Sequence, residues 1–401
     1  MPPFDLDALL DRWDGEAVVA DTDEPTGTRI FIAIHSTRLG PATGGTRMKP
    51  YPSPEAALQD AMRLSEAMTL KFALADFPAG GGKAVLAIPE GLDRDPAART
   101  GLLRRYGQLL QRCSGLFRTG PDVGTSSADM DLLYEEAPGF VFARSRELGG
   151  AGDSGPWTAL GVFCAIEATL AWLDEHGGRD VNRSRSGSDS SPVAGRPLDI
   201  TRPSPNADQR LDTPLPSPAA GRRIVVQGAG AVGGPLMLRL REAGAEVLFT
   251  DNSPSAIRRY RDELGFALVP SDAALETPCD VLSPCALGGV LNAETIPRLR
   301  CLAVAGASNN PLSSPEDAAR LRDRGILYAP DFVVNFGGAV AITGMEAYGW
   351  GIAEAEARVR RVAATLTEIY RRAEAHGTTP DEAARALADE RAQGGVRRDP
   401  R

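Results

Sequence analysis

Histidine, the side chain that most often transfers protons in enzymes, is almost absent from this chain. Only three histidines occur in 401 residues, at positions 35, 176 and 376. His176 and His376 each stand beside a glycine at an expected helix end, where a cationic side chain suits the helix dipole. Acid–base chemistry by histidine is therefore not expected. An enzyme built from this sequence must move protons with lysines and carboxylates.

Cysteine pairs and long apolar runs are also lacking. The five cysteines are odd in number and form no C-x-x-C pair, which fits neither a zinc site nor a disulfide framework. This usage indicates a reducing compartment. No apolar run approaches the roughly 18 residues of a membrane span, and the acidic N-terminal segment has no signal-peptide core. We expect a cytoplasmic protein with no bound metal and no membrane partner.

Basic residues are fewer than acidic residues in this chain. Aspartate and glutamate number 53 against 44 lysines and arginines, which gives a net charge of −9 and argues against nucleic acid as a partner. The chain is 42% hydrophobic and 24% charged, as in ordinary globular proteins. Its length suggests two domains.

The first part of the chain mixes strands and helices. Its apolar patterns predict strands at 28–35, 84–89 and 115–125 and helices at 54–71 and 97–112. We expect an α/β substrate and oligomerisation domain over residues 1–155.

The later part alternates more regularly. Short apolar strands and helices from residue 222 onward predict a Rossmann-type, doubly wound parallel sheet over 156–335, followed by a C-terminal helical segment, 336–401, that returns. Within it, residues 177–221 are rich in Ser, Pro, Arg, Asp and Gly without apolar period, so we expect a disordered surface insertion. This insertion is either a tolerated loop extension or a phosphorylation or docking segment.

A glycine pattern opens the second sheet. The motif G-x-G-x-x-G comprises Gly228, Ala229, Gly230, Ala231, Val232 and Gly233. It follows a β-branched strand, precedes a helix, and is followed by a second strand that ends at Asp251, which together predict a dinucleotide site. The helix N-terminus would hold the pyrophosphate, and Asp251 the adenosine ribose. Because its charge would repel a 2′-phosphate, Asp251 favours NAD over NADP.

Two lysines and one aspartate are candidates for the chemistry. Lys83 follows three glycines and precedes an apolar strand, where burial would lower its pKa toward that of a general base. The glycines are interpreted as space for substrate or cofactor. Lys71 stands at the end of the helix expected over 54–71, after Met68 and Thr69, and could bind a carboxylate in the same cleft. Asp122 ends a strand where it could face both lysines. Taken alone, the two lysines are more typical of a solvated surface.

Seven blocks of sequence together resemble one enzyme family, the Glu/Leu/Phe/Val dehydrogenases, and are most similar to its valine and leucine dehydrogenases. The blocks are LGPATGGTRM (39–48), MTLKFALADFPAGGGKAV (68–85), GPDVGTSSADMD (120–131), GGAGDSGPWTALGVF (149–163), PCALGG (284–289), AGASNNPL (305–312) and YAPDFVVNFGG (328–338). The resemblance implies NAD-dependent oxidative deamination of an L-amino acid to its 2-oxo acid and ammonium, by a homo-oligomer.

The resemblance also implies roles for individual residues. Lys71 matches the lysine that pairs with the substrate carboxylate, Lys83 the lysine that activates water, and Asp122 the carboxylate that exchanges a proton with the amine. The remaining matched positions are Leu39, Gly40, Gly45, Met68 and Asn309 at the substrate, with Gly40 to Gly45 as a loop, and Cys285, Ala286 and Asn309 at the cofactor.

The pocket wall departs from the family pattern at 335–346, where NFGGAVAITGME carries a bulky Phe336. A branched-chain substrate is the first interpretation, and an aromatic or specialised amino acid the second. Two further hypotheses are a catalytically idle NAD-binding protein and a dehydrogenase fold that performs another step in biosynthesis. Retention of Lys71, Lys83 and Asp122 argues against the idle protein, because burying charge without chemistry is costly.

Overall fold

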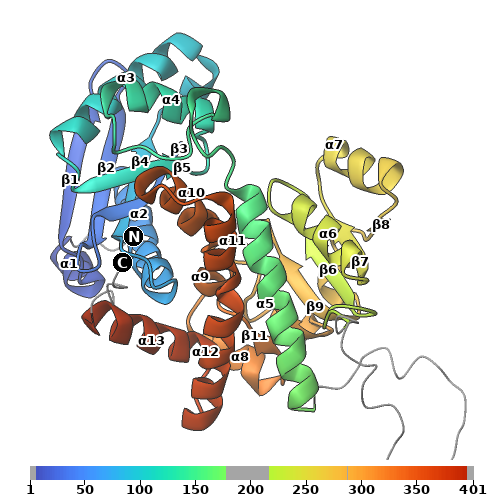
Figure 1. Cartoon of the computed structure of the whole chain (residues 1–401). Helices are drawn as coiled ribbons and strands as arrows, with labels where there is room; N and C mark the ends of the chain where they lie inside the picture. The colour runs from blue at the N-terminus through green and yellow to red at the C-terminus, as the bar shows by residue number, and fades with distance from the viewer. Residues whose placement is uncertain (1–5, 178–215, 287, 395–401) are drawn as a thin grey trace, which may run out of the picture.

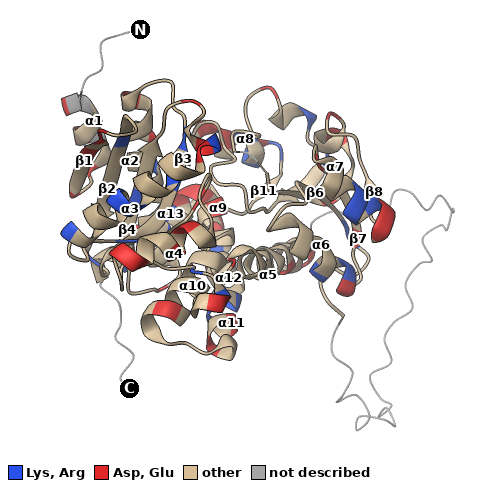
Figure 2. Ribbon diagram, turned by 90° about the horizontal axis from the view of Figure 1, so that it is seen from above, with Lys and Arg blue, Asp and Glu red and all other residues tan. Residues whose placement is uncertain are grey.

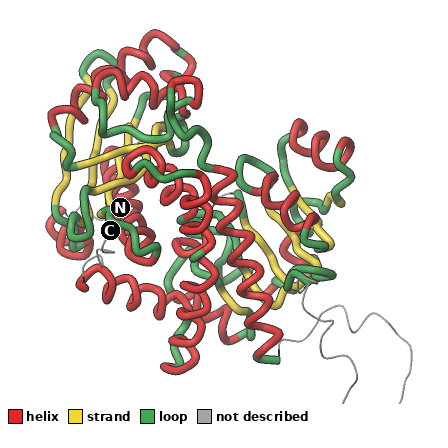
Figure 3. The backbone as a smooth tube through the Cα atoms, in the orientation of Figure 1, coloured by secondary structure: helices red, strands yellow, loops and turns green. Residues whose placement is uncertain are grey.

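The computed structural model describes residues 6–177, 216–286 and 288–394 (Figure 1). Each of two lobes is built around its own β-sheet, and long helices connect them (Figure 3). The elements of the first lobe are α1 (Leu6–Trp13), β1 (Ala17–Asp23), β2 (Thr28–Ser36), β3 (Ala42–Lys49), α2 (Pro54–Leu74), β4 (Gly80–Ala87), α3 (Pro96–Arg112), β5 (Phe117–Pro121) and α4 (Ser127–Glu136).

The rest of the chain forms the second lobe and the C-terminal helices. These elements are α5 (Gly155–Glu175), β6 (Arg223–Gln227), α6 (Gly233–Glu242), β7 (Glu246–Thr250), α7 (Pro254–Ile257), β8 (Ala267–Leu268), β9 (Cys279–Pro284), β10 (Cys301–Val304), α8 (Glu316–Asp323), β11 (Leu327–Tyr328), α9 (Asp331–Val334), α10 (Gly337–Tyr348), α11 (Ile352–Arg360), α12 (Val362–His376) and α13 (Pro380–Gly394).

The first sheet is mixed, with strand order β1-β2-β4-β3-β5. β2 runs antiparallel to β1 and β4, whereas β3 runs parallel to both β4 and β5. α2 packs on one face, and α3 and α4 supply apolar side chains to the other. The sequence patterns predicted β2, α2, α3 and β5, but missed β1 and β3. The expected loop at Gly40 to Gly45 is wrong, because strand β3 begins at Ala42.

The glycine run before Lys83 belongs to the central strand β4, which begins at Gly80 rather than at residue 84. A Cβ on Gly80 would lie 1.9 Å from the carbonyl oxygen of Ser36, and one on Gly81 would lie 2.1 Å from Oγ1 of Thr69 on α2. The glycines therefore admit the close packing of neighbouring backbone and helix α2. The interpretation that they clear space for a ligand is wrong.

The second sheet has the order β11-β10-β9-β6-β7-β8, and every pairing is parallel. Apolar clusters cover both faces, one including α5, α6 and α12 and the other including α8. This confirms the predicted doubly wound parallel sheet. The C-terminal helices return as expected: α12 packs on α5, and α13 reaches α2 of the first lobe. The helix after Ser253 is a short α7 continued by a π-helical turn, Arg258–Glu263.

Two further expectations concern α5 and the segment after it. Among the described residues, α5 alone is long and apolar enough to cross a bilayer, and half of that stretch is buried in the protein, as in a core helix. Most of the predicted insertion, 178–215, lies outside the described residues. Its last part is folded, because Ala219 is fully buried and Ser217 donates a hydrogen bond to Glu167 on α5.

Basic and acidic residues are interspersed over both lobes (Figure 2).

Candidate active site

A cavity of about 670 Å³ lies between the two lobes. The first lobe contributes α2, β3, β4 and the segment after β5, and the second contributes the glycine turn before α6 and the loop at Asn309. Helix α10 completes the wall. Lys71, Lys83, Asp122 and Asn309 all line this one space, although they are far apart in sequence.

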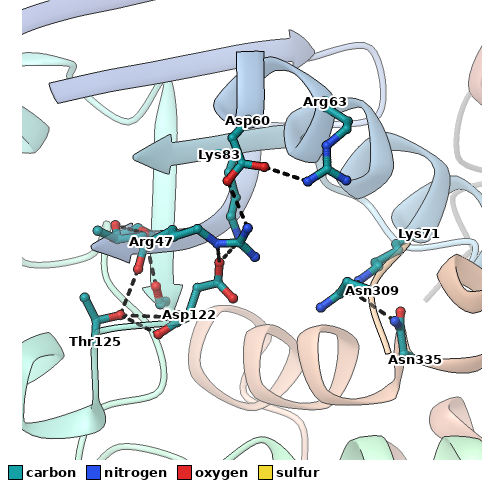
Figure 4. A network of polar contacts seen from close by, with 12 residues as sticks. Arg47, Asp60, Arg63, Lys71, Lys83, Asp122, Thr125, Asn309 and Asn335 are labelled. Atoms are coloured by element: carbon teal, nitrogen blue, oxygen red, sulfur yellow. Dashed lines mark hydrogen bonds and ion pairs between the residues drawn. The ribbon is translucent and has the colours of Figure 1, made fainter. Parts of the chain in front are cut away.

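Lys83 and Asp122 form an ion pair. Lys83 projects from β4, and its Nζ lies 2.8 Å from Oδ2 of Asp122, in the turn after β5. The Nε of Arg47 on β3 lies 2.8 Å from the same oxygen (Figure 4). Gly45 on β3 makes this approach feasible, since a Cβ there would lie 2.9 Å from Asp122 Cβ and 3.1 Å from the Nζ of Lys83. The predicted meeting of Lys83 and Asp122 is present in the structure.

Burial and charge shift the two members of this pair in the same direction. Burial lowers the pKa of Lys83, which Asp122 partly restores and Arg47 lowers further. Burial alone would raise the pKa of Asp122, but Lys83 and Arg47 outweigh it and hold that pKa well below its usual range. Asp122 is thus ionised, while the proton of Lys83 is easier to remove than that of a surface lysine.

Lys71 is on the last turn of α2, which continues to Leu74 beyond the predicted end. Its Nζ donates to Oδ1 of Asn309 at 3.0 Å, and the same oxygen accepts from Nδ2 of Asn335 at 3.1 Å. Because both donors use the amide oxygen, the amide nitrogen of Asn309 is left to donate elsewhere (Figure 4). Burial lowers the pKa of Lys71 to about 8, against the opposing charge of Asp331.

Not every predicted substrate residue reaches the cavity. Met68 and Gly45 line it. Leu39 and Gly40 do not: Leu39 belongs to the apolar core, and Gly40 faces the backbone of Pro78, with a Cβ position 2.4 Å from that carbonyl oxygen. The cavity lining thus does not support their assignment to substrate, which stays a prediction.

The glycine fingerprint has the geometry of a dinucleotide turn. Gly228 has a φ of +98°, and a Cβ on Gly233, the first residue of α6, would lie 1.8 Å from the carbonyl oxygen of Gly228. By contrast, no protein atom lies within 4 Å of a Cβ on Gly230, so the space beside it is open to a ligand. Ala231 and Val232 line the same cavity as the lysines. The turn thus fits NAD, with the pyrophosphate at the N-terminus of α6.

The other predicted cofactor residues surround this turn. Asp251 follows β7, and its carboxylate accepts hydrogen bonds from the backbone nitrogens of Ala229 and Ser253, both at 2.7 Å. Cys285 follows β9 and donates its backbone N–H to the backbone carbonyl oxygen of Gln227 at 2.7 Å. Ala286 packs against Gly228, where an added Cβ would come within 2.9 Å of its methyl group.

The wall on α10 is apolar. Gly338, Ala339, Ile342 and Thr343 line the cavity together with Phe142 of the first lobe. Phe336 does not; it is fully buried in the main apolar cluster behind the wall. The bulky residue noted in the sequence therefore does not narrow the cavity. Glu346 secures this wall by accepting hydrogen bonds from the backbone nitrogens of Ala143 and Ala151, both at 2.8 Å.

Arg47 is a site residue that the sequence reasoning missed, although it stands in the GGTRM segment. Its position beside Asp122 depends on the parallel pairing of β3 with β4, which sequence alone did not predict.

A second missed signal is the scarcity of lysine: the chain has three, Lys49, Lys71 and Lys83, among 44 basic residues. Arginine remains protonated in proteins and lysine can lose its proton, so a lysine in an arginine-rich chain is informative.

Comparison with known proteins agrees with this geometry. The family description "Glu/Leu/Phe/Val dehydrogenase, dimerisation domain" matches residues 16–138, and "Glutamate/Leucine/Phenylalanine/Valine dehydrogenase" matches residues 250–393. Leucine dehydrogenase of Geobacillus stearothermophilus is 32% identical, with 97% of this chain and 93% of that protein covered. Phenylalanine dehydrogenase of Lysinibacillus sphaericus is 36% identical, with 92% and 86% covered.

A solved structure extends the comparison. L-tryptophan dehydrogenase from Nostoc punctiforme matches with a TM-score of 0.72 and 32% identity, over 97% of this chain and 99% of that one. The chain belongs to the Glu/Leu/Phe/Val dehydrogenase family. It is therefore an oxidoreductase, an amino-acid dehydrogenase with NAD as its cofactor.

Proposed function

We propose that this chain catalyses the oxidative deamination of an L-amino acid with an apolar side chain to its 2-oxo acid and ammonium. The observation that carries the proposal is the Lys83–Asp122 ion pair, which shares one cavity with Lys71 and with the glycine turn. NAD, when bound, accepts the hydride from the substrate Cα. Every other step is assigned to residues of the cavity.

Each charged residue has a separate role in the proposal. Lys71 holds the substrate carboxylate, and Asn309, oriented by Lys71 and Asn335, donates its amide N–H to the substrate or the nicotinamide. Lys83 accepts a proton from the water that attacks the substrate iminium, since its pKa is lowered by burial. Asp122 exchanges a proton with the departing nitrogen. Closure of the cavity between the lobes excludes bulk water while the iminium exists.

The proposed substrate is a branched-chain amino acid. The α10 wall offers only small or aliphatic surface through Gly338, Ala339 and Ile342, with the hydroxyl of Thr343, and no charge that could pair with an acidic side chain. The leucine dehydrogenase relatives support this assignment.

An aromatic amino acid is the second candidate. Thr43, Gly120, Gly338 and Ala339 leave the cavity wide, and Phe142 could pack against a ring. The phenylalanine and tryptophan dehydrogenases among the relatives support this alternative.

The wider organisation is also proposed. Residues 1–155 would bind substrate and form a homo-oligomer, as the term dimerisation domain suggests; 156–335 would bind NAD; and 336–401 would connect the two. The five cysteines are free, which suits a cytoplasmic protein.

The test is NADH formation at alkaline pH across a panel of L-amino acids. The variant Lys83→Ala removes the proposed base. Lys49→Ala is its matched control, because Lys49 ends the neighbouring strand β3 and does not line the cavity. Turnover of valine, leucine or isoleucine that is lost in Lys83→Ala and retained in Lys49→Ala is the expected result.

The other outcomes separate the alternatives. Turnover of aromatic substrates alone would keep the roles of Lys71, Lys83 and Asp122 and overturn the branched-chain assignment. No turnover by a protein that binds NAD would contradict the proposed function and favour an idle homologue. A product other than the 2-oxo acid would indicate a repurposed dehydrogenase.

A further inference from the structure

The carboxylate of Asp122 is held through one of its two oxygens. The Nζ of Lys83 and the Nε of Arg47 both lie 2.8 Å from Oδ2. Within the described part of the chain, no donor bonds to Oδ1, and Figure 4 shows that oxygen on the side of Lys71 and Asn309. The shared contact therefore decides which oxygen of Asp122 meets the substrate.

Arg47 is itself fixed from behind by Asp60 on α2. The Nη1 of Arg47 donates to Oδ2 of Asp60 at 2.9 Å, and Asp60 also accepts from the hydroxyl of Tyr51 at 2.7 Å and from Nη2 of Arg63 at 2.6 Å. The side chains of Arg47 and Asp60 are only 12% and 13% exposed. The planar guanidinium can hold two carboxylates at once in fixed directions, which an ammonium cannot.

We propose that Arg47, anchored by Asp60, is a positioning residue of the reaction: it directs Oδ1 of Asp122 to the substrate and weakens the hold of Asp122 on the proton of Lys83. Its effect on turnover rests on the proposed function. Its effect on Lys83 rests on the contacts alone.

The electrostatic argument depends on sharing one oxygen. The charged groups that act on Lys83 are Asp122, Arg47, Asp60 and Lys71, and Asp122 alone of these has a direct contact with it among the described residues. With Asp122 alone, the ammonium form of Lys83 would gain the full attraction of a buried carboxylate. Arg47 occupies the same oxygen and repels the ammonium, so the neutral amine needed to activate water becomes easier to form.

The scarcity of lysine makes Lys83 directly measurable. Competitive acetylation with limiting acetic anhydride across pH, read by mass spectrometry, reports the pKa of each of the three lysines and needs no substrate. We expect Arg47→Met to raise the pKa of Lys83 by about one unit. The acid limb of the kcat/KM profile should move to higher pH by the same amount.

Two variants separate positioning from general charge effects. Arg63→Met removes the second arginine that contacts Asp60. Because the described contacts of Arg63 do not include Asp122, this variant should leave the pKa of Lys83 and the pH profile unchanged. Arg47→Lys keeps the charge and should return the pKa of Lys83 toward the wild-type value, while kcat stays reduced because one ammonium cannot hold Asp122 and Asp60 together. Should Arg47→Met fail to fold, Arg47→Gln removes the same charge and retains hydrogen-bond donors.

An unchanged pKa of Lys83 in a folded, charge-removing Arg47 variant would overturn the inference, as would an equal shift in Arg63→Met. A shifted pKa in a protein that turns over no amino acid would contradict the proposed function and leave the inference about Lys83 intact.

Discussion

The two sides of the proposed catalytic cavity differ in the kind of side chain that lines them. On the side of the first lobe, Arg47, Lys83 and Asp122 are charged, and contacts of 2.8 Å hold each in one direction. On the side of α10, Ala339 and Ile342 make no directed contact and define only a shape. Directed charge determines what reaction is possible, whereas shape determines which side chain fits. We therefore expect substitutions on the first side to abolish the reaction, and substitutions on the second side to change the preferred substrate and leave the chemistry intact.

The largest expected effect comes from changing one cation for another on the charged side. Lys83→Arg keeps the positive charge but cannot release its proton, so kcat should fall by about 10³-fold. Lys49→Arg, the same substitution outside the cavity, should change kcat less than twofold. Both are measured by NADH absorbance, with thermal unfolding to confirm folding. A Lys83→Arg variant with near-normal kcat would show that charge alone is enough.

A substitution on the apolar side should change selectivity and not mechanism. Ile342→Ala enlarges the cavity and should raise the ratio of kcat/KM for phenylalanine to that for leucine by about 10- to 100-fold. Val340→Ala on the same helix is the matched control, because Val340 is buried and does not line the cavity. Its ratio should match the wild type. Equal ratios in the two variants would remove α10 as the side-chain wall.

The loss of the proton of Lys71 should make KM for the amino acid depend on pH. Its pKa is lowered to about 8, so the ammonium proposed to bind the substrate carboxylate is present below pH 8 and is lost above it. KM for the amino acid should therefore rise about tenfold per pH unit above 8. In Lys71→Arg, whose side chain stays charged, this rise should disappear even if KM is higher throughout. A wild-type KM that stays flat to pH 10 would contradict the assignment.

The smallest effect is expected behind the apolar wall. Phe336 is fully buried and does not line the cavity, so Phe336→Leu should lower the free energy of unfolding by about 1 kcal/mol through lost packing. Urea unfolding measures this loss. The phenylalanine-to-leucine ratio should stay at the wild-type value, and a changed ratio would mean that Phe336 contributes to the pocket after all.

The sequence patterns succeeded where information is local. The strand, glycine turn and helix around Gly228 to Gly233 lie within one short segment, and backbone geometry requires glycine at Gly228 and Gly233. Alternating strands and helices likewise predicted the parallel second sheet. The mixed first sheet was only half predicted, since β1 ends in polar residues, β3 contains two glycines, and neither strand carries a clear apolar period.

By itself, the sequence determined the fold class and the dinucleotide turn, and it predicted Lys71, Lys83 and Asp122 as the reacting groups, because these depend on neighbouring residues or on recognisable segments. Only the tertiary structure decided how these groups are arranged. The pairing of β3 with β4 brings Arg47 onto the oxygen that Lys83 uses, and α2 places Asp60 behind it. It also decided that the glycines of β4 admit helix α2 and that Phe336 lies outside the cavity. Such contacts join residues far apart in the chain, and their distances exist only once the two lobes have packed.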